Sequence, residues 1–135
     1  MAFHLYHPEP CPSCGLDYIR FATSELCPRC GSDTAPLCDL VEEVVGYARL
    51  TLLRAGDLRL EAYQPVTPAD RYFILACDLL EAFRFYPTLD PALVAAEAIA
   101  HHRRHLGSDE ALLAHWQRFF EAVLLAWQEA RNKPI

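Results

Sequence analysis

The sequence predicts a mainly α fold, in which a small β segment at the N-terminus is followed by a four-helix array. Apolar residues recur at three- and four-residue steps from Asp39 onward. Helix-capping residues precede three of these stretches, and no helical period occurs before residue 38. We therefore expect two domains, residues 1–37 and residues 38–135.

Residues 1–37 carry turn signals and short extended runs. Aromatic and branched residues gather in Phe3–His7 and Leu16–Phe21, which lie beside prolines and glycines. These runs predict short strands. Apolar and polar residues also alternate over Leu58–Tyr63, between the first two helices, and favour one more short strand.

The first two helices have recognisable ends. The first stripe begins after Asp39 and stops at Gly56, a residue type that commonly follows a helix end. In the second helix Thr67 can cap, Pro68 suits the first turn, and Asp70 can complete a capping box. The apolar stripe of the first helix is Leu40, Val41, Val44, Val45, Ala48 and Leu52, and that of the second is Tyr72, Phe73, Ala76, Leu79, Leu80 and Phe83.

The last two helices are also bounded by caps. Asp90-Pro91 opens the third helix and Gly107 closes it, and Ser108 is the expected cap of the fourth. The apolar residues of the fourth helix occupy more of its circumference than one core contact requires: Leu112, Leu113, Trp116, Phe119, Phe120, Val123, Leu124 and Trp127. The helix is either central in its own bundle or shared with another chain. We favour a homodimer through helix 109–131, because twofold contacts are the commonest kind.

The composition places the chain among globular proteins. Of its 135 residues, 53% are hydrophobic and 22% are charged. A chain of this length buries roughly 65–70% of its unfolded surface, so the core needs no disulfides. No run of about 18 uncharged apolar residues occurs, so no membrane span is expected. The first residues show no signal-peptide pattern, and we expect a cytoplasmic protein.

Two cysteine pairs predict a metal site. The segments Cys11–Gly15 and Cys27–Gly31 read CPSCG and CPRCG. Two residues between the cysteines let both sulfurs reach one ion, and the following glycine permits the positive φ that brings amides close to the sulfurs. In a reducing compartment such pairs are metal ligands more often than disulfides. A four-sulfur tetrahedron suits zinc or iron. The candidate metal ligands are Cys11, Cys14, Cys27 and Cys30.

This doubled CPxCG pattern resembles the zinc-ribbon family, closely over residues 11–31 and loosely over 3–37. The resemblance implies that each of the four cysteines binds the metal. It implies no particular activity, because such ribbons serve in transcription, ribosomal, enzyme and adaptor proteins. Residues 38–135 resemble no family. Four protein ligands close the coordination sphere, so we expect one structural zinc ion, with rubredoxin-like iron as the alternative.

Several other residues invite a functional interpretation. Cys77 is expected in the core. Cys38 could be a replacement metal ligand or a core residue, and we prefer the core. His101, His102 and His105 lie in a basic run. Its functional interpretations are a second metal site or a phosphate-binding patch. We prefer the simpler interpretation, in which cationic groups near Gly107 complement the negative end of the third helix.

The sequence offers little support for an enzyme. Its five glycines form neither a phosphate-cradling loop nor a dinucleotide fingerprint, and no GxSxG occurs. Glu42, Glu43 and Glu97 fall on predicted polar helix faces. Catalytic groups assembled from separate helices would escape this search, so an enzyme stays an open hypothesis.

The charge argues against a nucleic-acid protein. The net charge is −6, and residues 1–36 hold four acidic residues against Arg20 and Arg29. Our first hypothesis is a non-enzymatic protein-interaction module or adaptor whose partner is another protein. The alternative is a nucleic-acid-associated or transcription-related ribbon that uses the two arginines and the 101–105 run.

Overall fold

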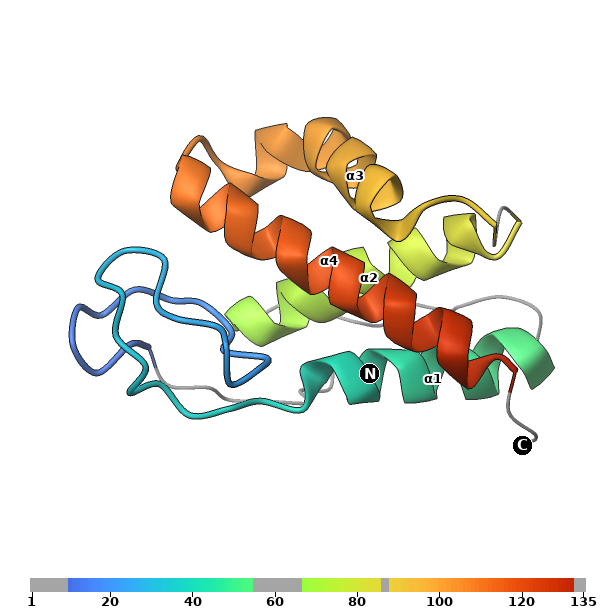
Figure 1. Ribbon diagram of the computed structural model, residues 1–135, viewed down its shortest axis with the longest axis horizontal. Coiled ribbons are helices and arrows are strands. Elements are labelled where there is room, and N and C mark those ends of the chain that lie inside the picture. The colour runs from blue at the N-terminus through green and yellow to red at the C-terminus, as the bar shows by residue number, and fades with distance from the viewer. Residues whose placement is uncertain (1–9, 55–66, 86–87, 133–135) are drawn as a thin grey trace.

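The computed structural model describes residues 10–54, 67–85 and 88–132, and it confirms the mainly α class (Figure 1). Its four helices are α1 (Leu40–Arg54), α2 (Pro68–Phe83), α3 (Pro91–Leu106) and α4 (Glu110–Ala130). Two of the expected strands, Phe3–His7 and Leu58–Tyr63, lie outside the described residues. No helix within the described ranges is long and apolar enough to cross a membrane.

The N-terminal segment is built from turns, with very little β structure. Over residues 10–39 the described backbone forms one isolated parallel bridge, between Arg20 and Leu37, and no strand over Leu16–Phe21. The Arg20 guanidinium cross-links the segment. It donates to the carbonyl oxygens of Glu25 and Ala35, both at 3.0 Å, and to those of two further residues. The donors for these carbonyl oxygens therefore come from the Arg20 side chain and not from the backbone amides of a neighbouring strand.

The predicted caps of α2 and α3 are confirmed. The Asp70 amide donates to the Thr67 hydroxyl at 3.3 Å, and the Thr67 amide donates to the Asp70 carboxylate at 2.9 Å. Asp90 caps α3, and Gly107 ends it with a φ of 90°.

The N-cap of α4 lies one residue later than the sequence predicted. Asp109, and not Ser108, accepts from the amides of Ala111 and Leu112, at 3.0 and 3.3 Å. The extended backbone of Asp109 places its carboxylate over the first free amides of the helix.

Helix α4 lies across the middle of the bundle (Figure 1) and packs against α1, α2 and α3. Phe119, Phe120, Val123 and Leu124 are fully buried. Trp116 stacks on Tyr72 of α2, with ring centroids 3.5 Å apart. The broad apolar face of α4 is therefore covered by its own chain.

The N-terminal segment packs against the first half of α4. Ile19 is fully buried in the helical core, and the ring of Phe21 contacts those of His115 and Phe119. Cys77 is fully buried and Cys38 is 8% exposed, both in this core, as the sequence predicts. The segment thus contributes side chains to the helical core as well as to its own.

Candidate metal centre

The two cysteine segments fold into the same turn. In the first, the Gly15 amide donates to the Cys11 carbonyl at 2.8 Å, and the Cys11 amide donates to Leu16 at 2.9 Å. In the second, the amides of Gly31 and Cys27 form the equivalent bonds, also at 2.8 and 2.9 Å. Gly15 and Gly31 have φ values of 79° and 74°, which residues with a side chain rarely adopt. The glycines are therefore required by the backbone conformation of the turn.

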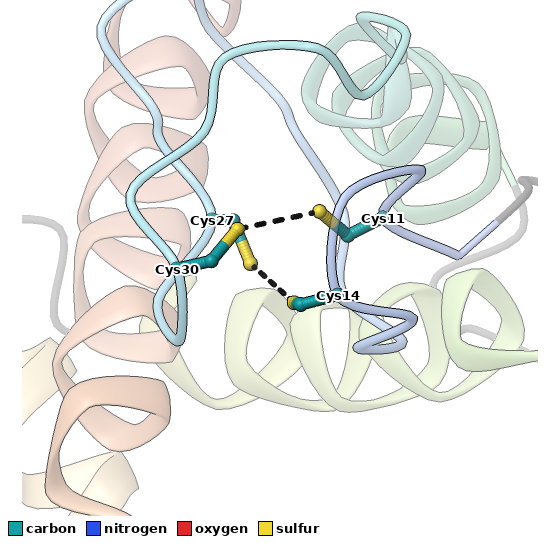
Figure 2. Close-up of side chains that lie close together, drawn as sticks. All are labelled: Cys11, Cys14, Cys27 and Cys30. Atoms are coloured by element: carbon teal, nitrogen blue, oxygen red, sulfur yellow. Dashed lines mark hydrogen bonds between the residues drawn. The ribbon is translucent and has the colours of Figure 1, made fainter.

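The turns face each other and bring the four sulfurs of Cys11, Cys14, Cys27 and Cys30 together (Figure 2). All four lie within 4.8 Å of one another, and this group could hold a metal ion. The Cys11–Cys30 and Cys14–Cys27 sulfur distances are 3.7 and 3.5 Å, far longer than a disulfide bond. Four sulfurs about 2.3 Å from a tetrahedral ion would lie about 3.8 Å apart. The spacing therefore fits one ion held by four thiolates.

The electrostatics of the group differ from sulfur to sulfur. Desolvation acts to raise the pKa of Cys11, but the amides of Cys14 and Ser13 and the neighbouring thiols donate to its sulfur, and its pKa falls to about 6. At Cys30 the Ser32 amide favours the thiolate, but desolvation and the neighbouring thiols outweigh it and raise the pKa to about 12. Because neighbouring negative charges oppose one another, four thiolates need a cation to coexist.

The site is close to the surface on one side. Cys11 and Cys27 are 2% exposed, whereas Cys30 is exposed. On its outer side Ser13, Ser32 and Thr34 form a small hydroxyl cluster, with Ser32 and Thr34 oxygens 2.7 Å apart. An ion can therefore reach the sulfurs without the helical bundle opening.

A largely buried polar network joins the chain just before Cys27 to α4. Glu25, two residues before Cys27, is 4% exposed. Its carboxylate lies 3.1 Å from His115 Nδ1 and accepts from Arg118 Nε at 3.2 Å. On the opposite side of the imidazole, His115 Nε2 lies 2.8 Å from the carbonyl oxygen of Ile19.

The position of one proton in this network follows from its acceptor. The Ile19 carbonyl can only accept, so His115 Nε2 carries a proton and donates it. Nδ1 faces a carboxylate oxygen of Glu25 at 3.1 Å. Burial lowers the pKa of His115, whereas the Glu25 carboxylate and the Ile19 carbonyl act in the opposite direction. Every polar atom of the buried imidazole is therefore partnered.

Sequence reasoning missed Glu25, His115 and Arg118. The contacts join residues about ninety positions apart, and no local pattern marks them. The one available signal is His115 itself, a polar residue between the apolar Leu113 and Trp116.

The basic run on α3 does not assemble a second metal site. The four cysteines are the one group of three or more potential ligands in the part of the chain that the structure describes. The rings of His101 and His102 are in edge-on contact, and Arg103 pairs with Glu110 across the turn to α4. His101 and His105 are exposed near the end of the helix, as the simpler interpretation expects. Glu42, Glu43 and Glu97 are exposed, as expected.

Comparison with protein-family models, curated proteins and solved structures found no match for this chain. The resemblance to zinc ribbons therefore rests on the two cysteine turns, whose geometry is described above.

Proposed function

We propose that Cys11, Cys14, Cys27 and Cys30 bind one structural zinc ion, and that the protein is a non-enzymatic interaction module that this ion stabilises. The observation that carries the proposal is the convergence of four sulfurs on two identical turns. Four thiolates fill the coordination sphere of zinc and leave no open position for substrate or water. Rubredoxin-like iron is the alternative ion, because it takes the same ligands.

A protein partner is supported by exposed apolar side chains. Leu26 and Leu37 of the N-terminal segment are 46% and 54% exposed, and Phe85 and Leu93 near the turn from α2 to α3 are both 66% exposed. A partner that covers these side chains would remove their apolar surface from water. We place the protein in the cytoplasm, where free thiols persist.

Two of the arginines that the nucleic-acid alternative uses have partners within the chain. Arg20 bonds backbone carbonyls, and Arg103 pairs with Glu110. Of the arginines in the ribbon, this leaves Arg29 exposed in the second turn.

A homodimer through helix 109–131 stays a prediction, but the observation that motivated it has a second explanation. The chain itself buries most of the apolar side chains of α4. Leu112 is half-buried, and Leu125 is 52% exposed. Static light scattering at micromolar concentration tests the dimer. A mass near the 15.3 kDa of one chain would contradict it.

Metal analysis tests the proposed function. Freshly purified protein should contain one zinc per chain and be colourless, whereas visible absorption would indicate iron. Cys27→Ser should abolish metal binding, and the matched control Cys38→Ser, at a buried cysteine outside the group, should retain it. Protein without zinc or iron would refute the proposal.

A further inference from the structure

A pocket of about 320 Å³ lies where the N-terminal segment meets three helices. The first turns of α2, the end of α3, the start of α4 and Asp17 line it, and none of the described lining residues is a cysteine. Its volume lies at the lower end of the range found for small-ligand sites. It is thus separate from the metal centre and large enough for a small molecule.

The walls of the pocket are mainly apolar and held in place. Tyr72 and Trp116 stack on each other and are 2% and 5% exposed, so their rings form a fixed surface. Leu106 of α3 and Leu112 of α4 extend this surface, and Ile74 of α2 adds to it. An apolar or aromatic group would gain by leaving water here, and the pocket need not reorganise to receive it.

The polar groups of the pocket are Arg71, His105 and Asp17, all exposed. Within the described part of the chain, neither Arg71 nor Asp17 forms an ion pair. Arg71 presents a guanidinium that matches a carboxylate, and His105 can donate in either protonation state. Two possible donors, Arg71 and His105, thus share the pocket with one carboxylate, that of Asp17.

We propose that this pocket binds a small apolar molecule that carries one carboxylate. The apolar part lies against Trp116 and Leu106, and the carboxylate lies toward Arg71. This ligand site goes beyond the proposed interaction module and does not depend on the identity of the metal.

Three probes of nearly equal shape test the charge requirement on the full-length, metal-loaded protein. They are 3-phenylpropionate, 3-phenylpropan-1-ol and 3-phenylpropylamine. Affinity is followed by amide chemical shifts, which should move at Leu75, Leu106 and Leu112, and by fluorescence. Trp116 lines the pocket and Trp127 does not, so Trp116→Phe should remove the fluorescence response.

We expect the carboxylate probe to bind about threefold or more tighter than the alcohol, and the amine to bind most weakly. Arg71→Gln should weaken carboxylate binding by about three- to tenfold. Arg104→Gln, an exposed arginine on α3 outside the described lining, is the matched control and should change nothing. Asp17→Asn removes a negative charge from the pocket and should strengthen binding of the carboxylate probe. Far-UV circular dichroism verifies that each variant is folded.

Equal affinities for the three probes in the natural protein would overturn the proposal, as would tightest binding of the amine. Equal losses of affinity for the carboxylate probe in Arg71→Gln and Arg104→Gln would also overturn it. The positive charges would then act on the probe at long range and not by contact in the pocket. The absence of saturable binding at millimolar probe concentrations would show that the pocket is not a ligand site.

Discussion

The N-terminal segment and the helical bundle depend on different sources of stability. The core of the segment consists of Cys11, Leu16, Tyr18, Cys27 and Ala35, and two of these five residues are proposed metal ligands. The helical core contains four fully buried aromatic and aliphatic side chains on α4 alone. A small segment that buries so little apolar surface needs a metal or cross-links to hold its fold. We therefore expect the bundle to fold around its own core.

The two regions are nevertheless in contact at a buried polar network. Ile19 enters the helical core, and the carboxylate of Glu25 pairs with His115 and Arg118 of α4. Loss of the metal should therefore disorder the turns and weaken the bundle, without unfolding it.

The largest expected effect is that of Cys27→Ser. Structural zinc supplies roughly 10 kcal/mol or more of apparent binding free energy at neutral pH. The variant should lose the metal and the order of both turns, while most of the helical far-UV signal persists. Circular dichroism with metal analysis measures both. Collapse of the helical signal together with zinc release would show that the regions fold as one unit.

The second effect is confined to the bundle. Phe119 is fully buried at the centre of α4, and Phe119→Ala should lower the free energy of unfolding by about 3–5 kcal/mol. Leu125→Ala, at a half-exposed site on the same helix, should change it by less than about 1 kcal/mol. Urea unfolding compares them. Similar losses for both variants would place α4 at the periphery of the bundle.

The third effect measures the connection between the regions. Glu25→Ala leaves the His115 imidazole buried without its partner, and should lower the free energy of unfolding by about 2–4 kcal/mol. Glu25→Gln should lose less, because the amide can donate to Nδ1 while its oxygen accepts from Arg118. Thermal unfolding measures both changes. If Gln proved as damaging as Ala, the charge of Glu25 and not its hydrogen bonds would carry the contact.

The smallest expected changes in the free energy of unfolding are a loss in the N-terminal segment and a gain in the bundle. Gly31→Ala places a side chain on a residue with a φ of 74°, which should cost about 1–2 kcal/mol and weaken zinc binding. Gly46→Ala lies within α1, where an added Cβ meets no atom within 4 Å, and should stabilise the bundle by about 0.5–1 kcal/mol. A stabilising Gly31→Ala would contradict the positive-φ turn.

The sequence predicted the features that depend on neighbouring residues. The N-caps of α2 and α3 involve residues at most three positions apart, and each cysteine turn is contained in six residues. It did not predict the features that depend on distant ones. The Arg20 guanidinium bonds carbonyl oxygens as far along the chain as Ala35, and no local pattern marks these contacts. The Glu25–His115 contact joins two segments whose approach only the tertiary fold determines.

The dependence of one region on metal, and the independence of the other, is tested most directly by hydrogen exchange and mass spectrometry with and without a chelator. With metal bound, the Gly15 and Gly31 amides, which donate at 2.8 Å within the turns, should be protected from exchange. After chelation we expect them to exchange freely, while the amides of α4 around Phe119 and Phe120 keep their protection. Equal loss of protection in the turns and in α4, or none in the turns, would contradict this account.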